Sequence, residues 1–62
     1  MKPTDIKAAR AELNMTLAEL AARVGVTLRA VQNWEAGTRK PTGPAVIVIE
    51  SLLAERRART AG

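Results

Sequence analysis

The hydrophobic positions of this chain fall into four short groups, each spaced as on one face of an α-helix. The first face has i, i+3, i+4, i+7 spacing and comprises Ile6, Ala9, Arg10 and Leu13. This spacing predicts a helix over residues 5–13. Thr4 is its expected N-cap, and Asn14 follows its last turn.

Residues 16–25 predict a second helix. Thr16 and Glu19 have the spacing of a capping box, in which each side chain accepts a hydrogen bond from the backbone N–H of the other residue. The apolar stripe that follows is Leu17, Leu20, Ala21 and Val24. Gly25 is expected to end this helix, because the residue after a helix often has a positive φ that glycine tolerates.

A third helix is predicted between Thr27 as N-cap and Gly37 as terminator. Its expected buried face is Leu28 or Ala30, then Val31, Trp34 and Glu35. Residues 38–41 form a polar, basic loop. A fourth helix is predicted from Thr42-Gly43-Pro44 to about Arg57, followed by a frayed tail to Gly62.

The fourth helix has one alternative. Residues 46–49 are all β-branched, which favours a strand. A helix is preferred because the apolar pattern continues to Leu53 and no second strand is available for pairing. A two-stranded ribbon between two copies of the chain stays open as the alternative.

Length and composition limit the possible classes. The 62 residues make a single domain, 1–62, near the lower size at which a chain folds without help. There is no Cys and no His, which excludes disulfides and ordinary zinc sites, and the lack of Cys fits a reducing cytosol. No nucleophile–base pair or glycine-rich phosphate loop is present, so we expect no enzyme, no cofactor and no metal. The N-terminus does not resemble a signal peptide, and the longest apolar run, 45–49, is far shorter than the roughly 20 residues of a membrane span.

The charge balance favours an anionic partner. Ten Lys+Arg against six Asp+Glu give a formal net charge of +4. Such an excess on a small domain suits nucleic acid or a membrane surface. A surface charge that only keeps the protein soluble is the alternative.

The second and third predicted helices have the spacing of a helix-turn-helix. Two helices that cross steeply bring their backbones close together, which the small Ala21 allows, and the short turn needs the positive φ of Gly25. The apolar residues expected inside are Leu20, Val24, Val26, Val31 and Trp34.

The segments LAELAARVGV and VQNWEAGTRKP resemble the second helix, the third helix and the following loop of the Cro/phage-repressor type of helix-turn-helix domain, often called the Xre family. The resemblance covers about residues 5–54 and implies an all-α, lambda-repressor-like bundle of four or five helices. In that family the third helix enters the DNA major groove, and the proteins usually bind as dimers. We expect this chain to end after its fourth helix, without the fifth helix or C-terminal strand of many relatives. The resemblance also implies a partly buried ion pair between Arg10 and Glu35, the alternative being two solvated charges.

The outer face of the third helix is expected to contact bases in the major groove. The candidates are Thr27, Leu28, Arg29, Gln32 and Asn33. Arg29 can donate two hydrogen bonds to guanine, and Gln32 or Asn33 can pair with adenine. Thr27 and Leu28 can pack on a thymine methyl, although Leu28 could instead fold back toward the core. The simpler alternative is that these residues contact no base and only form the polar outer face of an amphipathic helix.

Phosphate contacts are expected to flank this helix. The candidates are Thr16, Leu17, Arg23, Arg39 and Lys40. The N-terminus of the second helix offers N–H groups and a positive dipole end, while Arg39 and Lys40 follow the third helix. Arg23 is equally explained as a solvated charge. The basic residues 56, 57 and 59 fit the dipole at the end of the fourth helix.

Self-association is predicted from the fourth helix. Four consecutive apolar residues point in almost every direction around its axis, and a helix that is apolar all round is a buried one. We expect a second copy to cover one side, through Val46, Val48, Ile49, Leu52 and Leu53. Two-fold symmetry would set two recognition helices about 34 Å apart, which matches a palindromic site. A larger local core is the alternative.

These features together predict a cytoplasmic, sequence-specific transcription regulator that binds double-stranded DNA as a homodimer. The simplest form is a repressor of bacterial, phage, plasmid or mobile-element type, such as an autoregulator, an anti-CRISPR-associated regulator or a controller, with no membrane partner and no small-molecule ligand. The alternative from another functional class is a protein-interaction module, such as an antitoxin that binds a toxin through its last helix. A basic peptide lying on a membrane surface fits the ordered caps poorly.

Overall fold

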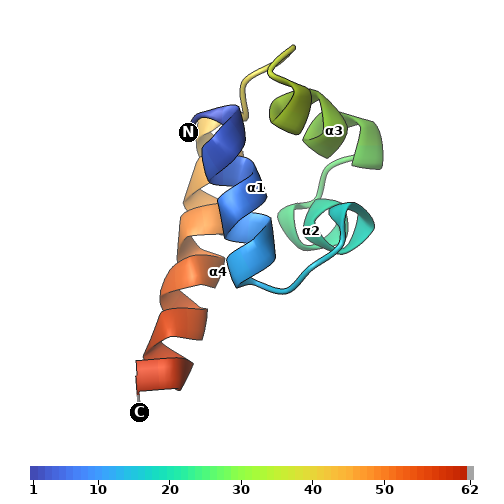
Figure 1. The fold of residues 1–62 in the computed structure, drawn as a ribbon. Helices are drawn as coiled ribbons and strands as arrows, with labels where there is room; N and C mark the ends of the chain where they lie inside the picture. The colour runs from blue at the N-terminus through green and yellow to red at the C-terminus, as the bar shows by residue number, and fades with distance from the viewer. Residues whose placement is uncertain (62) are drawn as a thin grey trace.

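The computed structural model describes residues 1–61, with side chains through Thr60, and contains four helices within this range. They are α1 (Pro3–Glu12), α2 (Leu17–Val24), α3 (Leu28–Ala36) and α4 (Gly43–Ala61). The predicted all-α bundle is therefore confirmed (Figure 1). The strand alternative for residues 46–49 is wrong, because this run lies inside α4.

α1 begins two residues earlier along the chain than the sequence pattern indicated, and Thr4 is not its N-cap. Lys2 is the N-cap, and its backbone N–H donates to Asp5 Oδ2 at 2.8 Å. Pro3 occupies the first helical position, where its missing N–H costs nothing and its fixed φ suits a helix. At the other end Asn14 has the positive φ, 56°, that stops the helix.

The caps of α2 and α3 are confirmed. Thr16 Oγ1 accepts from the Glu19 N–H at 3.1 Å, and Glu19 Oε1 accepts from the Thr16 N–H at 2.9 Å, which completes the capping box. Thr27 Oγ1 accepts from the Ala30 N–H at 3.2 Å. Gly25 has φ 84°, a left-handed conformation that lets α2 end and α3 begin within three intervening residues.

α4 is longer than predicted and continues past Arg57 to Ala61. Thr42 Oγ1 caps its start by accepting from the Ala45 N–H at 3.3 Å. At its other end Arg57 reaches Glu12 of α1, with 2.7 Å between Nε and Oε2, and Thr60 donates to the carbonyls of Arg56 and Arg57. These contacts hold the last turns, and the helix reaches Ala61. The rest of the predicted tail, Gly62, lies outside the described residues.

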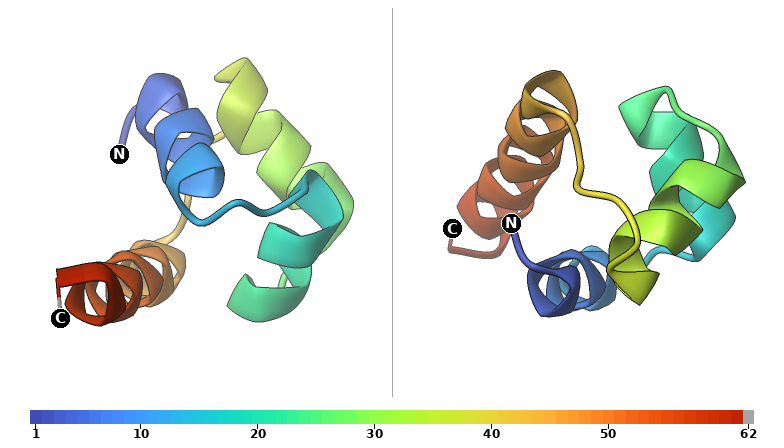
Figure 2. Two further views of the ribbon diagram at one scale, coloured as in Figure 1. Left: turned by 60° about the horizontal axis from the view of Figure 1, so that its bottom comes forward. Right: turned by 90° about the horizontal axis from the view of Figure 1, so that it is seen from above.

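The core lies between the four helices, where α1 and α2 each pack against α3 and against α4 (Figure 2). Its buried members are Ile6, Ala9, Leu13, Leu20, Ala21, Val31, Trp34, Ala45, Ile49 and Leu53. Val24 and Val26, both predicted inside, are half-buried against this cluster. Among the described residues, no helix has the length and apolarity needed to cross a membrane.

The expected exposed face of α4 is partly wrong. Ile49 is fully buried and Leu53 is 9% exposed, so both lie in the monomer's own core and are not available to contact a second copy of the chain. Val46, Val48 and Leu52 are half-buried. The large hydrophobic side chain that α4 exposes is Ile47, at 64%. The larger local core named as the alternative therefore accounts for Ile49 and Leu53.

Candidate nucleic-acid interface

The exposed side of α3 carries most of the residues expected to contact bases. Val31 and Trp34 face the core, and this turns Arg29 and Gln32 outward into solvent. Leu28 is 44% exposed, so it does not fold back, and Ala30 is half-buried against the core instead. The first two turns of α3 thus present a cation, an amide and an apolar side chain together, which are the groups that read base edges.

Asn33 differs from the other candidates because its side chain is half-buried. The backbone carbonyl of Asn33 accepts from the Thr38 N–H at 3.0 Å, from Thr38 Oγ1 at 3.2 Å and from the Arg39 N–H at 3.4 Å. The backbone at Asn33 therefore anchors the loop that carries Arg39. Sequence reasoning missed this anchor, although a threonine just past the helix-ending glycine was a usable signal.

The electrostatics of α3 and its loop are one-sided. Between Gly25 and Gly43 the chain has three cations, Arg29, Arg39 and Lys40, and a single acid, Glu35. Glu35 turns inward and is 10% exposed, with its Oε2 at 2.7 Å from Arg10 Nε. None of the three cations has an ion-pair partner among the described residues. This side of the molecule is therefore an uncompensated positive surface.

The Arg10–Glu35 pair holds α1 against the end of α3. Arg10 Nη2 also donates to Glu35 Oε1 at 3.3 Å, which makes the contact bidentate, and Arg10 Nη1 donates to the Met15 carbonyl at 3.4 Å. The hydrogen bond to the Glu35 carboxylate raises the pKa of Arg10 above its usual value. One guanidinium thus connects α1, the turn before α2 and the C-terminal half of α3.

The N-terminus of α2 has fewer available N–H groups than expected. The Thr16 N–H is already bonded to the Glu19 carboxylate, and this bond lowers the pKa of Glu19 below its usual value. The Leu17 and Ala18 N–H groups have no acceptor among the described residues. Any phosphate bound here would therefore use the N–H groups of these two residues and not that of Thr16.

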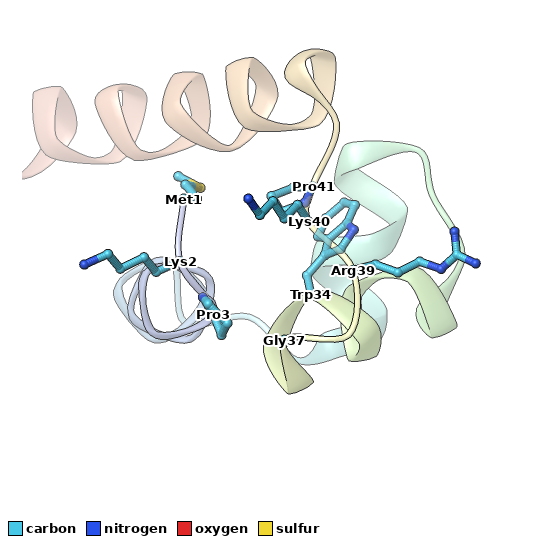
Figure 3. Close-up of a pocket in the computed structure, with 8 residues that line it drawn as sticks. All are labelled: Met1, Lys2, Pro3, Trp34, Gly37, Arg39, Lys40 and Pro41. Atoms are coloured by element: carbon cyan, nitrogen blue, oxygen red, sulfur yellow. The ribbon is translucent and has the colours of Figure 1, made fainter.

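Arg39 and Lys40 lie on the loop between α3 and α4, beside an open hollow of about 370 Å³. The other lining residues are Met1, Lys2, Pro3, Trp34, Gly37 and Pro41. Figure 3 shows the Arg39 side chain extending away from this hollow, while Lys40 extends toward Met1. The two cations therefore point to opposite sides of the loop and could meet two different phosphates.

Arg23 is separated from these loop cations. It lines a second hollow of about 150 Å³, with Leu13 and Met15 beside it and with Arg56 and Arg59 of α4. The structure brings Arg23 together with the end of α4 and not with Arg39 or Lys40. Its expected role as a phosphate contact gains no support from this position.

Comparison with known protein families gives the same assignment as the geometry. The family model described as helix-turn-helix, of the Cro/phage-repressor type, matches residues 6–57. Comparisons with curated proteins and with solved structures return no match. The match covers α2 and α3 with their caps, the turn at Gly25, the basic loop and most of α1 and α4. The chain belongs to the Xre-like helix-turn-helix family of DNA-binding transcription regulators.

Proposed function

We propose that this protein is a sequence-specific repressor that binds an inverted-repeat operator as a homodimer, with α3 in the major groove. Arg29 and Gln32 are the main base-reading residues, with Thr27, Leu28 and Asn33 beside them. Arg39, Lys40 and the N–H groups at the start of α2 contact phosphates. The protein acts in the cytosol or nucleoid of a bacterial cell as a phage, plasmid or mobile-element regulator.

The uncompensated positive surface of α3 and its loop carries this proposal. Glu35, the one acid in this segment, is turned inward to Arg10, so its charge does not oppose the approach of DNA. Three cations without ion-pair partners remain on the surface within the described residues. Neutralising phosphates releases condensed counterions, which supplies much of the affinity for DNA.

Selection from random duplexes tests this function. The protein would enrich binding sequences from a random pool at about 150 mM salt, where purely electrostatic affinity is suppressed. We expect an inverted repeat whose half-sites lie about one helical turn apart. Enrichment of a lone half-site would refute the dimer. No enrichment would refute sequence-specific DNA binding and favour a protein partner.

Single substitutions then test the base-reading role. Arg29→Ala should cost about 1–3 kcal/mol on the selected operator and relax the preference at one base position. The matched control is Arg56→Ala, which removes an exposed arginine from α4. Circular dichroism checks that both variants are folded. Unchanged preference in Arg29→Ala would contradict the assigned role.

A further inference from the structure

One exposed apolar side chain is not explained by the DNA-binding surface. Three large hydrophobic residues are exposed among the described residues: Leu28 at 44%, Met1 at 39% and Ile47 at 64%. Leu28 belongs to the outer face of α3, and Met1 lies beside the hollow near the loop. Ile47 belongs to neither, because it projects from the side of α4 opposite Ile49 and Leu53.

Small residues continue the face of α4 that Ile47 begins. Ser51, Ala54 and Ala58 follow Ile47 at i+4, i+7 and i+11, so the four side chains lie in one row along the helix. We call this row the α4 stripe. All four residues are exposed, and Ser51 Oγ already donates to the Ile47 carbonyl at 2.8 Å. The hydroxyl can therefore be covered without losing its hydrogen bond.

The charges of α4 make the helix complementary to a reversed copy of itself. Up to Glu55 the helix carries only acidic residues, Glu50 and Glu55, and after it only Arg56, Arg57 and Arg59. An antiparallel pair lays the acidic half of one helix against the basic half of the other. A parallel pair would align three arginines with three arginines, which is repulsive.

Glu50 and Arg57 are the charges that such a pair would join. Among the described residues Glu50 makes no side-chain hydrogen bond or ion pair, whereas each of the other five acids does. Arg57 uses Nε and Nη2 for Glu12, which leaves Nη1 as a donor. Both residues flank the α4 stripe on the same side.

We infer, building on the dimeric function proposed above, that a second copy of the chain docks antiparallel along the α4 stripe. In this register Ile47 of each copy packs on Ala58 of the other, and Ser51 meets Ala54. The small side chains let the two helix axes approach closely, and Glu50 of each copy reaches the open Nη1 of Arg57 in the other. The contact is isologous, as a closed two-fold dimer requires.

Sedimentation equilibrium without DNA tests the surface. We expect the wild-type chain to pass from monomer to dimer as its concentration rises, and Ile47→Glu to shift this midpoint at least tenfold. Ile47 is 64% exposed, so a glutamate there stays in water and leaves the fold intact. The matched control is Ala8→Glu on the exposed side of α1, which should dimerise normally. Wild-type protein that stays monomeric, or a dimer indifferent to Ile47→Glu, would overturn the docking surface.

Cysteine cross-linking tests the register, since the chain has no cysteine of its own. Chains carrying Ile47→Cys and chains carrying Ala58→Cys are mixed, oxidised and separated by mass. The mixed disulfide should dominate over either like pair, and Ala8→Cys with Ala58→Cys should give none above background. Dominant like pairs would overturn the antiparallel register.

Binding to a duplex with one half-site separates this inference from the proposed function. Ile47→Glu should bind a lone half-site as the wild-type chain does, because α3 and its loop are unchanged. Selective half-site binding without any dimer would overturn the docking surface and leave base recognition standing. A dimer that binds no half-site selectively would overturn base recognition and leave the docking surface standing.

Discussion

Removing Arg10 should destabilise the fold more than removing its partner Glu35. Arg10→Met leaves the Glu35 carboxylate, whose side chain is 10% exposed, without its two donors. Glu35→Gln leaves a guanidinium that is 30% exposed and can turn to water. Losing one partner of a fully buried pair costs about 3–5 kcal/mol, and an exposed pair contributes less than about 1 kcal/mol.

The partial exposure of this pair sets the expected size of the effect. We expect Arg10→Met to cost about 2–3 kcal/mol and Glu35→Gln about 1 kcal/mol of the free energy of unfolding. For a domain of this size the larger loss lowers Tm by about 10–20 °C. A protein this small has a total stability of the order of 5 kcal/mol, so Arg10→Met should be marginally folded near body temperature.

Urea unfolding followed by Trp34 fluorescence measures these losses, since Trp34 is the only tryptophan and is 5% exposed in the fold. The double variant closes a mutant cycle, whose coupling energy should exceed about 1 kcal/mol. The control is Arg59→Met, because the Arg59–Glu55 pair lies within α4, is 75% and 53% exposed and should matter much less. A coupling energy below about 0.3 kcal/mol would refute the structural role of the Arg10–Glu35 pair.

Three further predictions concern the turn, a cap and the loop. Gly25→Ala should lower the free energy of unfolding, measured in urea, by about 1 kcal/mol. The cause is the left-handed φ of 84° alone, since no heavy atom lies within 4 Å of the added methyl. An unchanged free energy of unfolding would contradict this. The Thr16 N–H and hydroxyl lower the pKa of Glu19 below its usual 4.5, so its contribution to stability is present above pH 4.5 and is lost as the pH falls through the lowered value. Glu19→Gln should remove this part of the acid-induced fall in Tm, and an unchanged pH profile would count against it. Arg39→Ala should reduce the slope of log K against log salt by about 1 without changing base preference; altered preference would instead indicate a base contact.

The caps of α2, α3 and α4 could be predicted because their causes are local. A threonine and a glutamate three residues apart exchange hydrogen bonds within one turn, and a glycine tolerates the positive φ that ends a helix. The start of α1 was missed for an equally local reason. Asp5 bonds to the backbone of Lys2, so the helix begins at Pro3 and Thr4 has no capping role.

The length and the exposed face of α4 could not be predicted from local pattern. Arg57 is 45 positions from Glu12, and nothing in the sequence pattern links the two. With four β-branched residues in succession, periodicity gives no preferred inner face. Only the packing of α1 and α2 decides that Ile49 goes inside and Ile47 outside. The buried residues of α2 and α3 were therefore predicted well. In α4, two residues expected at the dimer interface, Ile49 and Leu53, are core residues of the monomer.

The same long-range packing decides where the positive charge of the protein acts. Arg10 neutralises Glu35 on the inner side of α3, and Arg57 and Arg59 neutralise Glu12 and Glu55 along α4. Each pair contains one acid and one cation, so the net charge of +4 comes from the side chains outside these pairs. Arg29, Arg39 and Lys40 supply three of those cations on α3 and its loop. The small charge excess of the chain is thereby concentrated beside the helix that we expect to enter the groove, where it can act on the DNA phosphates.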